Sequence, residues 1–216
     1  MYSTTESDTT LRQLSKYNNT NPIHRIALNR FFDRIVEALR AIAPQSVLDF
    51  GCGEGLFLQE LEQRGLRFPH YTGLDLREDA LAMARSLHPE RQFLQGDVMQ
   101  WSAPDAAFDL VIASQVLEHL PEAGRVLDRL VQLSTRHLLL TVPWEPWFRT
   151  MNLLRGRDLR RFGNHPEHVN LWAVRRFRAF VSQHATVLRV MTAFPFIIVI
   201  AAPSVNSPAE SAGRSR

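Results

Sequence analysis

The sequence predicts a doubly wound α/β fold, with a mostly parallel sheet, helices on both of its faces and an antiparallel C-terminal edge strand. Two observations predict it. Short apolar runs that are typical of buried strands alternate with helical repeats between residues 46 and 142, and this alternation implies a parallel sheet with right-handed crossovers. Two further apolar runs, 185–192 and 196–201, lie on either side of Pro195 and can supply the antiparallel edge.

Each expected element follows from a local pattern. Pro22 stands where a helix can begin, apolar residues recur at helical spacing from Ile23 to Ile42, and Pro44 ends the segment. The apolar runs predict strands at 46–50, 70–76, 91–97, 108–113 and 137–142. Helices are expected at 56–64, 77–87, 121–134 and 172–183.

The length of 216 residues suits one such domain, which we expect to span 21–202 between disordered polar tails at 1–20 and 203–216. The N-terminus lacks a basic start followed by an apolar core, and the longest apolar run, 193–202, is too short to cross a bilayer, which takes about 20 residues. A soluble, cytoplasmic protein is therefore expected. Cys52 is the only cysteine, which excludes intrachain disulfides and cysteine-based zinc or iron–sulfur sites.

A glycine-rich run follows the first expected strand. Residues 47–55 read VLDFGCGEG, and the glycines permit a tight turn and a close approach of the backbone to a ligand. The spacing is GxGxG, with Leu56 where the last glycine of the dinucleotide-binding GxGxxG pattern would fall. Asp49, just before the turn, suits a ligand that carries an ammonium group better than a pyrophosphate. Cys52 is interpreted as a small filler of the turn.

Carboxylates and a hydroxyl follow the next strands. Asp75 ends the second strand and can accept hydrogen bonds from both hydroxyls of a ribose. Asp97 ends the third strand and is placed to meet an adenine edge, and Ser114 follows the fourth. Each residue also has a structural interpretation: Asp75 as a solvated strand end and Asp97 as a helix N-cap. Their joint occurrence favours a nucleoside pocket at the carboxyl ends of the strands.

In order along the chain, these motifs resemble those of the class I S-adenosylmethionine-dependent methyltransferases of the small-molecule type. VLDFGCGEG is similar to the first motif of that family, GLDL to its ribose motif, QGDV to its adenine motif and FDLVIASQVLEHL to its fourth-strand motif. The resemblance covers about residues 22–202 and implies a Rossmann-like, seven-stranded sheet with S-adenosylmethionine as the cofactor. It implies that the cofactor is lined by Gly51, Gly53 and Gly55, with Asp49 near the methionine amino group, Asp75 on the ribose, Leu76 against the adenine, Asp97 on the adenine amino group, the Val98 amide on a ring nitrogen and Ser114 near the methionine.

A sulfonium is an activated methyl donor, so the protein mainly has to align an acceptor and exclude water. An acceptor hydroxyl or amine can need a base, and histidine suits that role because its pKa lies near neutrality. The candidates are His119, after the fourth strand, and His165 and His168, in the segment where the family builds its acceptor site. The alternative is structural, with Glu118 and His119 as a capped helix end and His165 ordering a loop.

A metal-assisted reaction is a further alternative. Some quinone-biosynthesis O-methyltransferases and small-RNA 2′-O-methyltransferases carry an E-x-x-E-H motif that binds a divalent ion. This chain reads QVLEH at 115–119. Because the neutral Gln115 stands where the first carboxylate belongs, the site is weakened for a hard cation, and no metal is expected.

The segment 143–171 is expected to form a lid over the acceptor site. Trp144 and Trp147 share one face if the segment is helical, and Arg149 begins a cluster of arginines. One interpretation places the aromatic rings over an apolar, lipid-like or quinone-like acceptor and the arginines toward an anionic group or a membrane surface. In the other, the rings pack on the core and the arginines are solvated. We expect a small-molecule acceptor that is methylated on oxygen or nitrogen.

Three other functions are compatible with parts of the sequence. An RNA 2′-O-methyltransferase would gain from the arginines, but the chain has no separate binding domain and a formal net charge of only +3. A protein that binds S-adenosylmethionine without transferring its methyl group would keep the same motifs. A nicotinamide oxidoreductase is disfavoured by the GxGxG spacing and by Asp49. The sequence carries no signal for an oligomeric state.

Overall fold

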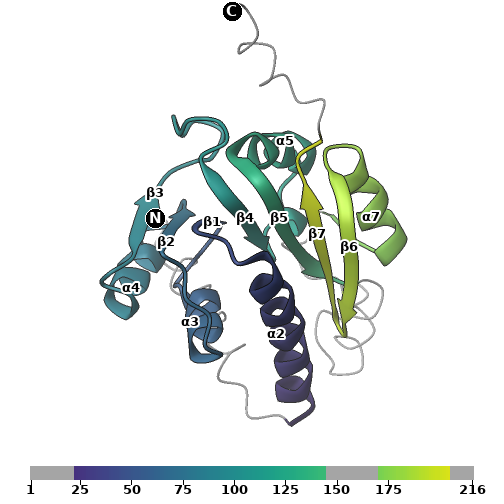
Figure 1. Cartoon of the computed structure of the whole chain (residues 1–216), viewed down its shortest axis with the longest axis horizontal. Coiled ribbons are helices and arrows are strands. Elements are labelled where there is room, and N and C mark those ends of the chain that lie inside the picture. Colours follow the sequence, from purple (N-terminus) through teal and green to yellow (C-terminus); the bar gives the residue numbers. More distant parts are fainter. Residues whose placement is uncertain (1–21, 145–169, 205–216) are drawn as a thin grey trace, which may run out of the picture.

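The computed structural model describes residues 22–144 and 170–204. Helices and strands alternate along the chain as the sequence predicts (Figure 1). Their bounds are α2 (Pro22–Ile42), β1 (Ser46–Phe50), α3 (Leu56–Gln63), β2 (His70–Asp75), α4 (Glu78–Leu87), β3 (Gln92–Gln95), β4 (Phe108–Ser114), η1 (Leu117–His119), α5 (Ala123–Leu133), β5 (Ser134–Pro143), α7 (Val174–Ser182), β6 (Thr186–Ala193) and β7 (Phe196–Ala202).

The strands form one seven-stranded sheet in the order β3-β2-β1-β4-β5-β7-β6. The strands from β1 to β5 pair in parallel, whereas β7 lies antiparallel between β5 and β6. This confirms the predicted fold class. The antiparallel C-terminal strand, β7, is the second strand from the edge of the sheet, and β6 forms the edge itself. The strand order reverses between β1 and β4, which makes the carboxyl ends of these two strands the topological switch point, where sheets of this kind bind ligands.

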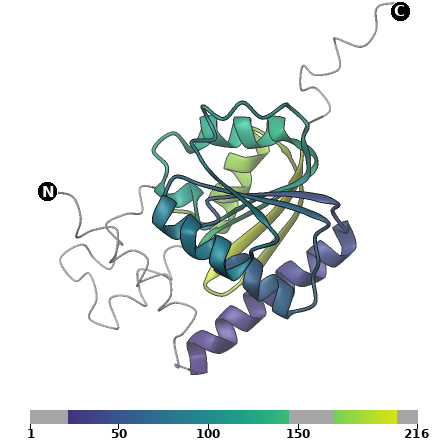
Figure 2. The ribbon, with the colours of Figure 1, turned by 90° about the vertical axis from the view of Figure 1, so that its left-hand side faces the viewer.

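Helices cover both faces of the sheet (Figure 2). Buried residues of α2, α3 and α4 pack with one face, and buried residues of α5 and α7 pack with the other. Successive residues of β4 alternate between these layers: Leu110 and Ile112 belong to the first cluster, Val111 and Ala113 to the second. Because both faces are buried, the central strands read as continuous apolar runs in the sequence.

Two strand boundaries differ from the prediction by more than one residue. The third strand, expected over 91–97, is only Gln92–Gln95, because Asp97 begins a turn in which its carbonyl oxygen accepts hydrogen bonds from the N–H groups of Gln100 and Trp101. The fifth strand begins at Ser134, directly after α5, and not at 137. Its first residues are polar and exposed or held by local hydrogen bonds, so hydrophobic periodicity alone does not reveal them.

Residues 1–20 and 205–216 of the predicted tails, and residues 145–169 of the predicted lid, lie outside the described residues. Within the described ranges, none of the helices combines the length and the apolar character that a bilayer crossing requires.

Candidate active site

A glycine loop, residues 51–55, joins β1 to α3 at the switch point. Gly51, Gly53 and Gly55 have positive φ angles of 72°, 53° and 76°, a region in which a Cβ causes strain. At Gly51 there is also no room, because a Cβ would lie 2.5 Å from a methyl carbon of Val116. The Gly51 N–H donates to the Leu74 carbonyl oxygen at 2.7 Å. The loop is therefore held against the ends of β2 and β4.

Asp75, the last residue of β2, faces the glycine loop. Its Oδ2 accepts a hydrogen bond from the Gly53 N–H at 2.9 Å, and its Oδ1 accepts one from the Arg77 N–H at 2.9 Å. The Arg77 guanidinium pairs with the buried Glu54 at 2.9 Å. These bonds fix the orientation of the carboxylate. Because a carboxylate has about four lone-pair sites, it keeps the capacity to accept hydrogen bonds from ligand hydroxyls.

Asp49 is buried in β1, with 2% of its surface exposed. Its Oδ2 accepts a hydrogen bond from the Tyr71 hydroxyl at 2.6 Å. Burial raises the pKa of Asp49 to about 7, the Tyr71 bond opposes the rise, and the negative charge of Asp75 adds to it. No cationic side chain of the described residues contributes to this pKa. A buried carboxylate of this kind can receive an ammonium group from a ligand.

The ends of β2 and β3 carry the residues predicted to contact adenine. The Leu76 side chain is apolar and 65% exposed, so it offers a surface against which a flat ring can pack. The Asp97 Oδ1 accepts a hydrogen bond from the Met99 N–H at 2.9 Å. Asp97 therefore caps a turn, whereas the structural interpretation from the sequence had it as the N-cap of a helix. The Val98 side chain is buried in the core, which leaves only its backbone for a ligand.

Ser114 and Gln115 end β4 and are tied to β5. The Ser114 and Thr141 hydroxyl oxygens lie 2.9 Å apart, and the Gln115 amide nitrogen donates to the same Thr141 oxygen at 3.2 Å. Gln115 has a positive φ of 59°. Because its side-chain amide is engaged with β5, Gln115 is poorly placed to replace the first carboxylate of the E-x-x-E-H metal motif.

Glu118 and His119 lie in η1, a turn that follows β4. The Glu118 side chain is 1% exposed and that of His119 is 35% exposed, with the His119 Nε2 3.9 Å from the Glu118 Oε1. Asn170 fastens the turn: its Nδ2 donates to the carbonyl oxygens of Leu117 and Leu120 at 3.1 and 2.7 Å, and its N–H donates to that of Glu118 at 3.0 Å. Sequence reasoning missed Asn170, because its partners lie about fifty residues away in the chain.

Replacing Asn170 by alanine is expected to lower the free energy of unfolding by about 1–3 kcal/mol, because two carbonyl groups next to the core lose their donor. The control is Asn29→Ala, which removes an exposed contact with Arg64 and should change stability by less than about 0.5 kcal/mol. Thermal unfolding of the two variants checks the prediction. Equal melting temperatures would contradict the role given to Asn170.

Glu62, His88 and Glu90 form the one group of three potential metal ligands among the described residues, with ligand atoms within 4.8 Å of one another. Arg91 already pairs with both carboxylates, with its Nη2 2.7 Å from Glu62 and its Nε 3.4 Å from Glu90. This cation disfavours a divalent ion. The buried His88 has its Nε2 3.1 Å from the Gly55 carbonyl oxygen, so the cluster braces the glycine loop.

Cys52 lies inside the glycine loop and is 6% exposed. Burial raises the pKa of its thiol far above the ordinary value, so the reactive thiolate is suppressed. A Cβ at Gly73 would lie 2.8 Å from the Cys52 sulfur and 2.5 Å from the Phe93 ring. These contacts favour the interpretation of Cys52 as a small residue that fills the space beneath the loop.

Trp144 directly follows β5, at the carboxyl edge of the sheet. Its ring packs edge-on against Phe194, with the ring centroids 6.5 Å apart. Both residues line a hollow of about 540 Å³ between α2 and the end of β6, together with two basic and two acidic residues of α2, Arg30, Arg34, Asp33 and Glu37. The other residues predicted for the acceptor site lie outside the described residues: Trp147, Arg149, His165 and His168.

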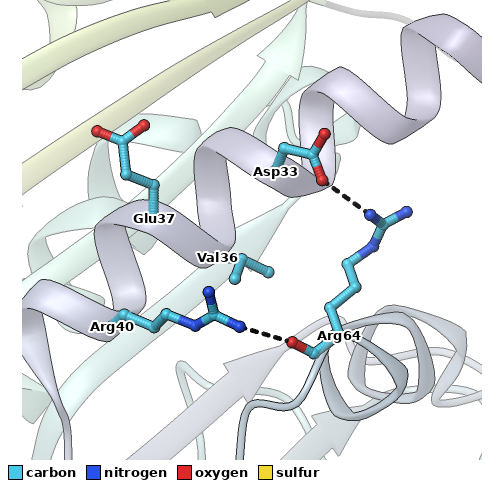
Figure 3. Close-up of a pocket in the computed structure, with 5 residues that line it drawn as sticks. All are labelled: Asp33, Val36, Glu37, Arg40 and Arg64. Atoms are coloured by element: carbon cyan, nitrogen blue, oxygen red, sulfur yellow. Dashed lines mark hydrogen bonds and ion pairs between the residues drawn. The ribbon is translucent and has the colours of Figure 1, made fainter.

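A second hollow, of about 500 Å³, lies against α2 and is lined by charged side chains (Figure 3). Arg64 pairs with Asp33 at 2.9 Å, and Arg40 donates to the Arg64 carbonyl oxygen at 2.9 Å. Arg40 lies near the end of α2 that leads into β1, so the hollow extends toward the amino ends of the strands. Asp33 and Arg64 pair with each other and Glu37 pairs with Arg189, and the hollow lies away from the glycine loop.

Comparisons with known proteins agree on one family. A family described as "Methyltransferase domain" matches residues 23–184. The trans-aconitate 2-methyltransferase of Escherichia coli is 33% identical over 124 residues, which are 56% of this chain and 47% of that protein. The ubiquinone biosynthesis O-methyltransferase of Aeromonas salmonicida is 30% identical over 118 residues, 52% and 48% of the two chains. The chain thus spans about half the length of these curated relatives.

A solved structure extends the likeness over nearly the whole fold. The magnesium protoporphyrin IX methyltransferase of Synechocystis, with bound S-adenosylhomocysteine, superposes with a TM-score of 0.68 at 21% identity, covering 93% of this chain and 95% of that one. At this identity the likeness concerns the fold. Together with the match to residues 23–184, it leads to one conclusion: the chain belongs to the methyltransferase-domain family and has the fold of the class I S-adenosylmethionine-dependent methyltransferases.

Proposed function

We propose that this chain transfers a methyl group from S-adenosylmethionine to an oxygen or nitrogen atom of a small, largely apolar molecule. The observation that carries the proposal is the position of Asp75. Its carboxylate lies at the switch point of the sheet, oriented by two backbone N–H groups, beside a loop of three glycines with positive φ. An acceptor-only group next to a backbone free of Cβ atoms suits a nucleoside.

The residues at the carboxyl edge fit the different parts of this cofactor. The buried carboxylate of Asp49 would receive the methionine ammonium group, and Ser114 would lie near the same moiety. Asp75 would hold the ribose hydroxyls. The exposed side chain of Leu76 would pack on the adenine, with Asp97 and the backbone N–H of Val98 on its polar edge. The glycine loop of Gly51, Gly53 and Gly55 would line the cofactor along its length.

When bound, the sulfonium supplies a methyl group that is already activated for transfer. The residues of the chain then have to orient the acceptor, exclude water and take its proton. Of the three predicted bases, His119 lies within the described residues. Its imidazole is partly exposed at the carboxyl edge of the sheet, in a turn held by Asn170. We propose His119 as the base, with His165 and His168 as the alternatives.

The hollow beside Trp144 supports the choice of acceptor class. The rings of Trp144 and Phe194 offer apolar faces to a flat molecule. The charged side chains of the hollow balance one another, since Arg30 and Arg34 stand beside Asp33 and Glu37, and Arg34 pairs with Glu37 at 3.5 Å. Trp147 and Arg149 are proposed to extend this site. One relative is named an O-methyltransferase of ubiquinone biosynthesis, which supports an apolar acceptor, whereas another is named for trans-aconitate, a small polar anion. Contact with a lipid surface, from which an apolar acceptor could be drawn, is part of this proposal.

The purified chain is expected to bind S-adenosylmethionine and S-adenosylhomocysteine, because the carboxylates and the glycine loop recognise the parts that these molecules share. Titration calorimetry measures the binding. Incubation with isotope-labelled S-adenosylmethionine and a cell extract, followed by mass spectrometry, identifies the labelled acceptor. If calorimetry detected no heat of binding with either ligand, the proposal would be refuted. Binding without transfer to any acceptor would favour the alternative of a non-catalytic S-adenosylmethionine-binding protein.

A further inference from the structure

A buried hydrogen bond joins Tyr71 of β2 to Asp49 of β1. The phenol oxygen lies 2.6 Å from the Asp49 Oδ2, and the two residues are 4% and 2% exposed. The Tyr71 ring is fixed by aromatic neighbours, with the Phe93 ring centroid at 6.0 Å and that of Phe68 at 6.2 Å. The phenol therefore has little freedom to turn away from the carboxylate.

The register of the two strands explains the contact. Tyr71 pairs with Val47, and Asp49 pairs with Gly73, so Tyr71 reaches Asp49 diagonally from two positions earlier on β2. Gly73 has no side chain to stand between them. Since alternate residues of a strand share one face, Tyr71, Val47 and Asp49 point to the same side of the sheet. The bond occupies one carboxylate oxygen of Asp49 and leaves the other for a ligand.

We propose that Tyr71 is a positioning residue that keeps Asp49 ionised and oriented for the ammonium group of the cofactor. This inference rests on the proposed function, in which Asp49 meets the methionine amino group. Tyr71 touches neither the cofactor nor the acceptor in this arrangement. It acts through Asp49, as a neutral donor that stabilises the carboxylate form without adding a positive charge that would repel the ammonium group.

The groups around Asp49 set the direction of the effect. Burial and the negative charge of Asp75 raise the pKa of Asp49, which reaches about 7, and the Tyr71 bond works against them. Cys52, in the glycine loop, is the other titratable neighbour, and β4 presents the apolar Ile112 at the paired position. With this pKa, Asp49 is increasingly protonated below about pH 7. The affinity for an ammonium-bearing ligand should therefore rise as the pH rises toward and through 7.

The test compares wild type with Tyr71→Phe, using two ligands between about pH 5.5 and 7.5, a range that brackets the pKa of Asp49. S-Adenosylhomocysteine carries the ammonium group, and 5′-methylthioadenosine has the nucleoside and the sulfur without it. Loss of the phenol should raise the pKa of Asp49 by about one pH unit. The S-adenosylhomocysteine dissociation constant should then rise about tenfold at the low end of the range and about threefold at the high end. Binding of 5′-methylthioadenosine should stay unchanged.

A general packing defect would weaken both ligands by a factor that does not vary with pH, and that result would overturn the inference. Overlapping pH profiles of wild type and Tyr71→Phe would overturn it as well. In an Asp49→Asn background the same tyrosine substitution should have no further effect on binding, because the ionising group is gone. If wild type bound neither ligand, the proposed function itself would fail, which is a separate result.

Discussion

Asp75→Ala is expected to weaken the binding of S-adenosylmethionine by about 10- to 150-fold. This range corresponds to the 1.5–3 kcal/mol that hydrogen bonds to a charged group contribute. The substitution removes the acceptor for ligand hydroxyls and also frees the N–H groups of Gly53 and Arg77 that now orient the carboxylate. Calorimetric titration of wild type and variant measures the loss.

A matched control separates this effect from a change in charge. Asp105→Ala also removes one carboxylate, but Asp105 lies outside the glycine loop and pairs with Arg129 at 2.6 Å, so cofactor binding should be unaffected.

A ligand analogue tests the ribose contact separately. The 2′-deoxy analogue of S-adenosylhomocysteine should bind wild type more weakly than the parent, and Asp75→Ala should no longer distinguish the two. If Asp75→Ala still bound S-adenosylhomocysteine more tightly than its 2′-deoxy analogue, the assignment of Asp75 to the ribose would be contradicted.

Gly51→Ala is expected to destabilise the fold by roughly 2–5 kcal/mol and to abolish tight cofactor binding. The positive φ of 72° costs an alanine about 1–2 kcal/mol. The new Cβ would lie 2.5 Å from Val116, and overpacking of this kind costs about 1–3 kcal/mol more. Val116 is β-branched and cannot easily turn away. The loop that contacts the cofactor would have to shift.

Gly65→Ala is the control for the backbone alone. Gly65 has a φ of 82°, yet the nearest atom to an added Cβ is the Arg40 guanidinium at 3.8 Å. Its cost should stay at about 1–2 kcal/mol, and cofactor binding should be preserved. Thermal unfolding of both variants compares the two losses of stability. For a domain of this size, each kcal/mol lost lowers the melting temperature by about 2–4 °C. Equal losses of stability would mean that the Val116 contact has no part in holding the loop.

Local patterns in the sequence predicted the order of the elements and the positions of the glycine loop and of Asp75. This was possible because strands buried on both faces read as short apolar runs. The patterns were less informative where polar residues begin or end a strand. Ser134 starts β5 and Gln95 ends β3, and neither boundary follows from periodicity. Asp97, which the sequence predicted to end the third strand, lies two residues beyond it in a turn.

Contacts between distant residues could not be predicted. The bond of Tyr71 to Asp49 spans 22 residues, and the bond of Asn170 to Leu120 spans 50. Such pairs depend on the register of neighbouring strands and on the path of the connections between them, and the spacing of residues along the chain sets neither.

The alternation of strands and helices, the fold class and the carboxylates that follow the strands can be predicted from the amino-acid sequence, because each depends on residues close together in the chain. The groups that surround those carboxylates become known only from the folded arrangement of the chain. It placed the Gly53 and Arg77 N–H groups on Asp75 and the Tyr71 hydroxyl on Asp49. The burial, hydrogen bonding and pKa of a side chain depend on its neighbours in space, which local sequence patterns do not specify.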